Sequence, residues 1–141
     1  VVTLPSSVFR PMSFHQTLLS NRTALITGGG TGLGRAMGER FLELGATVII
    51  CGRRAQVLED AAREMMAEKG GKVVAIPCDI RDAAAVDAMM DRAWAECGGI
   101  DILVNNAAGN IASPTERLSH RAVDAVLGIV LHGSFYCTLA A

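Results

Sequence analysis

The feature that most constrains the fold is a glycine-rich turn, which follows the apolar run 23–26 and precedes the helical pattern 35–44. The turn reads Thr27-Gly28-Gly29-Gly30-Thr31-Gly32-Leu33-Gly34. Glycines permit positive φ and close approach of a ligand to the backbone, while free N–H groups at a helix start attract anions. A strand, a glycine turn and a helix in this order predict that all eight residues cradle a dinucleotide pyrophosphate. A purely structural turn is the alternative.

Composition narrows the class of protein. The 141 residues are 50% hydrophobic, and 13 basic and 14 acidic residues leave a net charge of −1, which fits one domain with an ordinary core. Because the charges are interspersed, we expect no nucleic-acid partner. No apolar run reaches the length of about 18 residues that spans a bilayer, so we expect a soluble protein without a membrane partner.

The four cysteines are far apart in sequence and are not accompanied by a histidine cluster. They are Cys51, Cys78, Cys97 and Cys137. This spacing predicts no metal site and no disulfide framework, and it favours buried thiols in a reducing compartment.

The first residues differ in charge from the rest of the chain. Residues 1–22 contain Arg10, His15 and Arg22 but no acidic residue. A cytoplasmic protein with a plain extension over residues 1–20 is the favoured interpretation, and a mitochondrial leader is the alternative. We expect one domain over residues 21–141, and we expect it to be incomplete because the sequence stops within a helical pattern.

Four short runs rich in β-branched residues, 23–27, 47–51, 72–78 and 100–105, alternate with helical patterns. This alternation predicts an α/β fold with a doubly wound, Rossmann-type parallel sheet, truncated after the fourth helix. Right-handed crossovers and one change of direction give the strand order 3-2-1-4, which places Pro77 on an edge strand. We interpret the apolar stripes of the helices, including Val57 and Leu58, as core. A ligand is expected at the carboxyl ends of the first and fourth strands.

The residues after the second strand indicate which dinucleotide binds. An acidic residue here would select NAD by binding the ribose 2′-hydroxyl, but the sequence reads Gly52-Arg53-Arg54. A guanidinium binds a 2′-phosphate, so NADP(H) is favoured, with Arg53 as the main contact. Two solvated arginines are the alternative. Asp79, after the third strand, is expected either to accept a hydrogen bond from the adenine amino group or to act as a turn residue.

Two motifs carry a resemblance to a known family. The form Thr-Gly-x-x-x-Gly-x-Gly at residues 27–34 is typical of short-chain dehydrogenases/reductases, and residues from about 13 to 141 resemble the N-terminal half of these enzymes. The run from Asn105 to Ser119 resembles the 2,4-dienoyl-CoA reductase branch, including Ala108 before a delayed Gly109. Val130 stands where most of the family carries asparagine, a departure that this branch shares. The resemblance also places Ile80, Asn106 and Ala107 at the cofactor.

The resemblance implies a reaction. NADPH would give hydride to a conjugated dienoyl thioester, and Asn110 together with a tyrosine would hold the dienolate oxygen. Arg81, Ile111 and Ser119 match positions that contact the acyl-CoA, although a surface turn, packing and a helix cap are their ordinary alternatives. Family members are commonly tetramers, so we expect a homo-oligomer when the protein is full length.

The family's catalytic Tyr-x-x-x-Lys is not found in this sequence. Its one tyrosine, Tyr136, is followed four residues later by Ala140, and we expect Tyr136 to be a packing residue. The chain therefore resembles the cofactor half of a reductase, with the motif expected beyond residue 141, and we expect this half to be inactive alone. The alternatives are another short-chain reductase acting on an enoyl or 3-oxoacyl thioester, and a non-catalytic nucleotide-binding module.

Overall fold

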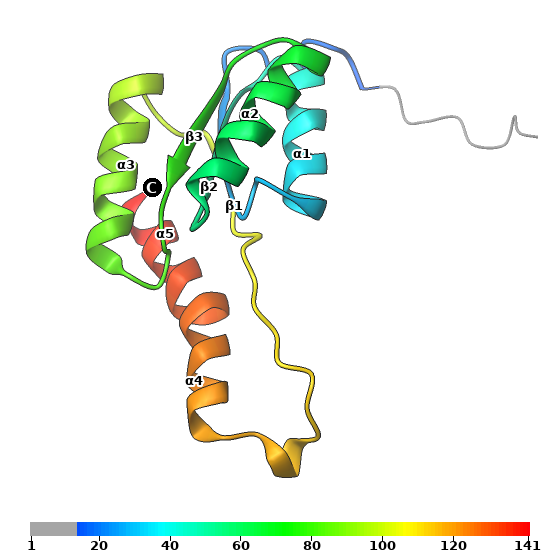
Figure 1. Ribbon diagram of the computed structural model, residues 1–141. Coiled ribbons are helices and arrows are strands. Elements are labelled where there is room, and N and C mark those ends of the chain that lie inside the picture. The colour runs from blue at the N-terminus through cyan, green and yellow to red at the C-terminus, as the bar shows by residue number, and fades with distance from the viewer. Residues whose placement is uncertain (1–13) are drawn as a thin grey trace, which may run out of the picture.

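A computed structural model describes residues 14–141, so Arg10 and most of the predicted extension lie outside the described residues. The chain forms a four-stranded parallel sheet in the order β3-β2-β1-β4, which confirms the predicted fold class and strand order (Figure 1). The strands are β1 Thr23–Thr27, β2 Thr47–Gly52, β3 Val73–Pro77 and β4 Ile102–Val104. The first three helices are α1 Gly32–Glu43, α2 Ala55–Lys69 and α3 Ala83–Cys97.

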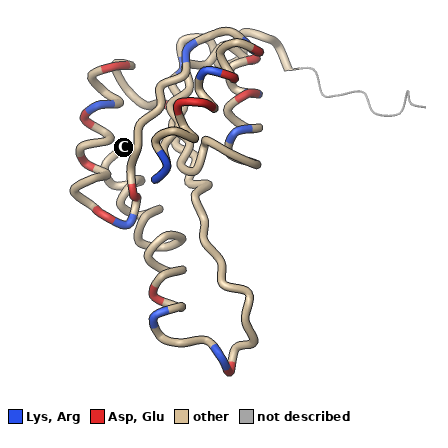
Figure 2. Tube along the Cα trace, in the orientation of Figure 1, with Lys and Arg blue, Asp and Glu red and all other residues tan. Residues whose placement is uncertain are grey.

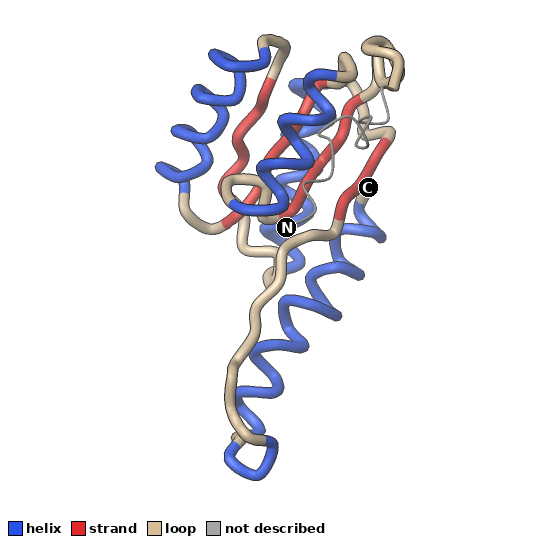
Figure 3. The backbone as a smooth tube through the Cα atoms, turned by 90° about the vertical axis from the view of Figure 1, so that its right-hand side faces the viewer, coloured by secondary structure: helices blue, strands red, loops and turns tan. Residues whose placement is uncertain are grey.

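Both faces of the sheet are covered by helices (Figure 3). Leu25 and Ile49 pack on one face with the apolar side of α3, while Ile26 and Ile50 pack on the other with α1 and α2. Side chains alternate between the two faces of a strand, so β1 and β2 must be apolar throughout when both faces are buried. All five residues of β1 are buried. This explains why the first two strands are continuous apolar runs in the sequence.

The ends of the elements follow local chemistry that the sequence predicts. The Asp82 side chain accepts hydrogen bonds from the N–H groups of Ala84 and Ala85 and so caps α3. Gly98 ends α3 in the left-handed conformation, with φ of 77°, which costs a glycine little. Pro77 lies on β3, an edge strand, as predicted. These ends fix where the loops at the carboxyl edge of the sheet begin.

Residues 105–141, which we call the arm, lead away from the sheet to a tip near residues 115–117 and then return, so that residues 134–140 pack beside α3 (Figure 1). The arm consists of an extended segment with a short helix η1 Thr115–Arg117, then α4 His120–Leu127, the π-helical segment η2 Gly128–Gly133 and α5 Ser134–Ala140. Ser119 caps α4 by accepting a hydrogen bond from Ala122 N–H, as predicted. Within the arm only Gly133 and Cys137 are buried.

The arm leaves the expectation of no membrane partner untested. Residues His120–Ala140 form one helical stretch of 21 residues with a mean hydropathy of 1.5, long and apolar enough to cross a bilayer by length and composition alone. Polar residues interrupt this stretch, so it contains no unbroken apolar run of about 18 residues. Residues 125–141 nevertheless include no Asp, Glu, Lys or Arg. Charges gather at the tip of the arm and along α1 to α3 (Figure 2). One such helix is weak support for a membrane span, because helices of soluble proteins pass the same test.

Candidate cofactor site

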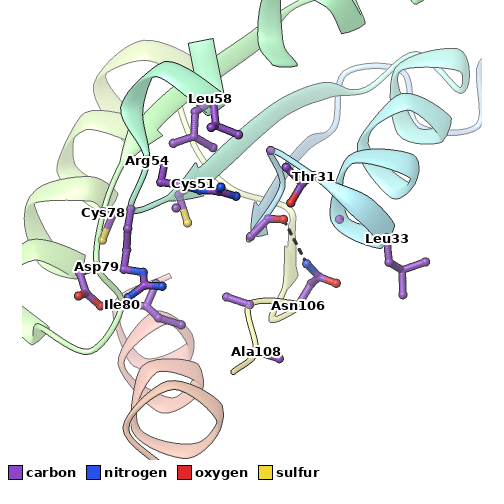
Figure 4. Close-up of a pocket in the computed structure, with 17 residues that line it drawn as sticks. Thr31, Leu33, Cys51, Arg54, Leu58, Cys78, Asp79, Ile80, Asn106 and Ala108 are labelled. Atoms are coloured by element: carbon purple, nitrogen blue, oxygen red, sulfur yellow. Dashed lines mark hydrogen bonds between the residues drawn. The ribbon is translucent and has the colours of Figure 1, made fainter. Parts of the chain in front are cut away.

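A pocket of about 360 Å³ opens at the carboxyl ends of the strands (Figure 4), within the size range of small-molecule sites. Ten of the thirteen residues predicted at the cofactor line it. These are Gly28, Gly30, Thr31, Leu33, Gly34, Arg53, Asp79, Ile80, Asn106 and Ala107. The other three, Thr27, Gly29 and Gly32, support the same turn without lining the pocket.

The glycine turn needs its glycines at two positions for different reasons. Gly28 has φ of 67°, a conformation that side-chain-bearing residues rarely adopt. At Gly34 a Cβ atom would meet the carbonyl oxygen of Gly28 and would lie 2.6 Å from Asn106 Nδ2. Any side chain at 34 would therefore push the turn away from the end of β4.

The N-terminal end of α1 borders the pocket, because Thr31, Leu33 and Gly34 all line it. Thr31 is the N-cap, yet its side chain makes no capping hydrogen bond with the described residues, and the first turn contains no acidic residue. The partial positive charge of a helix start is thus not neutralised by a protein carboxylate. This arrangement fits an anionic ligand such as a pyrophosphate.

Thr27 and Asn106 join the glycine turn to β4. The fully buried Thr27 Oγ1 accepts hydrogen bonds from the N–H groups of Asn106, at 3.0 Å, and Ala107, at 2.9 Å. Asn106 Nδ2 donates in return to Thr27 O at 2.9 Å. Because these bonds occupy the Asn106 amide, this residue shapes the pocket by holding its two walls together.

Charged side chains border the pocket beyond β2 and β3. Arg53 and Arg54 follow β2 and line the pocket, and Asp79 lines it from the end of β3. The Arg81 guanidinium donates from Nε to both oxygens of Asp79, at 2.9 and 3.1 Å. This hydrogen bonding, joined by the charge of Arg53, lowers the pKa of Asp79. The carboxylate predicted to meet adenine is therefore already paired with Arg81 in this structure.

Two cysteines also line the pocket. Cys51 and Cys78 are buried, and burial raises the pKa of both thiols, that of Cys78 to about 11. They are therefore protonated at neutral pH and act as small apolar groups. No group of three or more potential metal ligands occurs among residues 14–141.

The residues predicted at the substrate lie outside this pocket. Asn110, Ile111 and Ser119 belong to the arm, where Asn110 Oδ1 accepts a hydrogen bond from Ile111 N–H at 2.8 Å. Arg81 pairs with Asp79 and packs near Gly128 of the arm. The structure thus brings most of the residues predicted at the cofactor to one pocket, whereas those predicted at the substrate are spread between the loop after β3 and the arm.

Seven residues that line the pocket were not predicted at the cofactor from the sequence. Val57 and Leu58, interpreted only as core, line the pocket from the first turn of α2, although Leu58 is also buried in the core. The first turn of a helix that follows a strand lies at the carboxyl edge of the sheet, and this position was the available signal. The other residues missed are Cys51, Gly52, Arg54, Cys78 and Ala108.

Tyr136 lies away from the pocket, as predicted. It packs against the core cluster that contains the buried residues of α3, and the centroid of its ring lies 6.3 Å from that of His132.

Comparison with known proteins agrees with this geometry. The chain is 37% identical over 123 residues to a probable 2,4-dienoyl-CoA reductase of Bacillus subtilis, covering 87% of this chain and 48% of that protein. It is 38% identical to the peroxisomal 2,4-dienoyl-CoA reductase of Rattus norvegicus over 86% of this chain and 42% of that protein. Among solved structures, the citronellol catabolism dehydrogenase AtuB of Pseudomonas aeruginosa superposes with a TM-score of 0.84 at 38% identity, over 90% of this chain and 52% of that one.

The chain therefore spans about half the length of these relatives. The family model described as short chain dehydrogenase matches residues 22–141. With the glycine turn, the strand order and this match in agreement, the chain belongs to the short-chain dehydrogenase/reductase family.

Proposed function

We propose that the chain is the NADPH-binding part of an oxidoreductase that resembles 2,4-dienoyl-CoA reductases. The observation that carries the choice of cofactor is the pair Arg53 and Arg54 at the pocket edge, with no acidic residue directly after β2. A guanidinium favours the 2′-phosphate of NADP(H), whereas NAD would be selected by a carboxylate at this point. The names of the Bacillus and rat relatives support the choice of substrate.

The described pocket fits such a cofactor. Gly28 to Gly34 and the start of α1 would hold the pyrophosphate, because this wall offers backbone close approach and an unneutralised helix start. Arg53 would bind the 2′-phosphate, and Asp79 and Ile80 would border the adenine. Asn106 and Ala107 would form the pocket wall at the end of β4. NADPH supplies hydride when bound, and the residues of this chain position it.

The substrate would approach from the arm. Asn110 is suited to hold a developing oxyanion. Its Oδ1 accepts a hydrogen bond from Ile111 N–H, and its Nδ2 donates to no other residue in 14–141. A neutral amide donor stabilises a dienolate without undergoing proton transfer. Arg81, Ile111 and Ser119 would contact the acyl-CoA along the same side.

A second candidate function is a nucleotide-binding module without catalysis. The described pocket is compatible with it, because a module of this kind needs only the cofactor site. A short-chain reductase of an enoyl or 3-oxoacyl thioester is a third, because the cofactor pocket is compatible with each substrate. We further propose a cytoplasmic or mitochondrial location and a homotetramer for the full-length protein.

Replacement of Arg53 tests the assignment of the cofactor. Arg53→Ala should weaken NADPH binding by about 1.5–3 kcal/mol, the scale of a hydrogen bond to a charged group, and leave NADH binding nearly unchanged. Fluorescence titration with both cofactors measures this difference. Arg63→Ala, which removes an exposed arginine of α2 paired with Asp60, is the matched control and should alter neither affinity. Equal losses for the two cofactors in Arg53→Ala would contradict the 2′-phosphate assignment.

A further inference from the structure

The helical part of the arm, residues 120–140, comes close to the wall of the cofactor pocket where Gly133 meets Ile80. Ile80 lines the pocket and is 6% exposed, and Figure 4 shows it beside the arm helix. A Cβ atom on Gly133 would lie 2.6 Å from Ile80 Cδ1, 2.7 Å from its Cγ1 and 3.1 Å from its carbonyl oxygen. The helix approaches this pocket wall more closely than any other residue type at 133 would allow.

Several further contacts hold the helix in this position. Cys137, one turn after Gly133, is fully buried in the same core cluster as Ile80. Asn105, directly after β4, donates from Nδ2 to Thr138 Oγ1 at 3.0 Å. The π-helical segment η2 ends at Gly133, and such segments often accompany functional sites. The helix is thus held to the core and to the end of β4 at Cys137 and Thr138, about one turn after Gly133.

We propose that Gly133 is a positioning residue for the cofactor pocket. By lacking a side chain, it lets the arm helix seat against Ile80 and fixes the pocket wall that faces the adenine end of the cofactor. Gly133 acts through Ile80 and does not itself line the pocket. The arm helix thereby sets the affinity of a site that it does not itself line. The inference rests on the proposed function only in its use of NADPH as the probe.

Gly128 offers a matched comparison on the same helix. Its backbone angles, φ −56° and ψ −36°, are close to those of Gly133, φ −60° and ψ −39°. A Cβ atom at 128 would meet Arg81 Cδ at 3.8 Å, an ordinary van der Waals distance. Alanine should favour the helix equally at both positions. The two substitutions therefore differ mainly in whether they displace Ile80.

The experiment compares Gly133→Ala and Gly128→Ala in the expressed chain. Gly133→Ala should shift the NMR signal of the Ile80 δ1 methyl group and weaken NADPH binding about tenfold, within the range that overpacking of a tight contact produces. Gly128→Ala should leave the methyl signal in place and change the affinity less than about twofold. Isotope-labelled NMR spectra and fluorescence titration of NADPH provide the two measurements.

A second substitution separates positioning from a general loss of structure. Ile80→Ala in the Gly133→Ala background removes both side-chain atoms of the clash, so the double variant should bind NADPH like Ile80→Ala alone. If Gly133→Ala does not fold, recovery of the folded state in the double variant supports the contact, and failure of both to fold overturns the proposal. Unchanged affinity and an unmoved Ile80 methyl group in Gly133→Ala would also overturn it. A wild-type chain that binds no NADPH would contradict the proposed function, and the methyl signal would still decide the role of Gly133.

Discussion

The region from β1 to β4, residues 23–104, and the arm, residues 105–141, differ sharply in how their side chains are buried. In the first region, which we call the sheet half, two core clusters cover both faces of the sheet and include residues from every strand and from α1 to α3. In the arm only Gly133 and Cys137 are buried. The sheet half therefore contains most of its own stabilising contacts, whereas the arm depends on the few residues where it joins the sheet.

The outer part of the arm shows what this dependence leaves open. Val123, Leu127, Val130 and Leu131 are exposed although they are large and apolar. Such a group of side chains is unusual on a monomer surface and tends to associate. Most of the pocket wall comes from the sheet half, and the arm contributes Asn106, Ala107 and Ala108 at its start and the contact of Gly133 with Ile80.

The largest effect expected concerns activity. The sheet half should bind NADPH, but the chain should show no measurable turnover of 2,4-dienoyl-CoA, because it lacks the family's Tyr-x-x-x-Lys. Loss of one oxyanion donor alone costs about 10²–10³ in rate, and an incompletely held nicotinamide and acyl chain add to this loss. NADPH fluorescence measures binding, and the decrease in NADPH absorbance with substrate measures turnover.

Turnover would break the separation of binding from chemistry. It would mean that Asn110, or a residue not assigned a chemical role such as Tyr136 or His132, is sufficient for the reaction. Asn110→Ala, Tyr136→Phe and His132→Ala would then identify which of these residues carries it.

The next effect compares cavities in the two regions. Ile49→Ala in β2, where the side chain is 0% exposed, should lower the free energy of unfolding by about 2–5 kcal/mol through lost burial and a cavity. Leu139→Ala in the arm, where the side chain is 81% exposed, should change it by less than about 0.5 kcal/mol. Urea denaturation followed by circular dichroism at low protein concentration measures both. Equal losses would show that the arm is as well packed as the sheet half.

The same division explains what the sequence could predict. The strand order is confirmed, and it could be predicted because burial on both faces imposes continuous apolar runs on β1 and β2. The glycine turn could be recognised because close packing and positive φ impose glycine there. Arg53 and Asp79 were found because strand ends in a parallel sheet meet at one edge. In these places local sequence and tertiary position point to the same answer.

The arm could not be predicted equally well. Its 120–140 stretch has a helical pattern, but this pattern does not indicate the π-helical segment at Gly128–Gly133, which lies close to Arg81, Ile80 and Gly109. The core position of Leu58 was predicted, but its place in the pocket wall was not, because one side chain contributes to both. The pairing of Asp79 with Arg81 is set by side-chain geometry that neither residue type reveals alone.

A smaller effect concerns association of the arm. The expressed chain should form oligomers or aggregates, and Leu127→Lys together with Leu131→Lys should reduce this association about tenfold by placing charge on the exposed apolar face. Met66→Lys, at an exposed position of α2 in the sheet half, should have no such effect. Sedimentation velocity over a range of concentrations measures the change. A monomeric wild-type chain with a sharp, cooperative thermal transition would contradict the prediction.

The smallest effect concerns acid and the start of β1. Asp101 accepts a hydrogen bond from Thr23 N–H at 2.8 Å and pairs with Arg22 at 2.6 Å, and these contacts, the backbone bond first, lower the pKa of Asp101. An unfolded aspartate titrates near pH 4, so the stabilisation is complete above that value and is lost as pH falls through the lowered pKa of the folded state.

Urea denaturation at a series of pH values from 7 to 2.5 should therefore show stability falling with acid in the wild type. The fall should be smaller in Arg22→Ala and smallest in Asp101→Asn, because Arg22→Ala keeps the dominant backbone bond to an ionised carboxylate and Asp101→Asn removes the titrating group. If Asp101→Asn loses stability in parallel with the wild type over this range, the ionised Asp101 carboxylate does not stabilise the junction of β1 and β4, and the prediction is wrong.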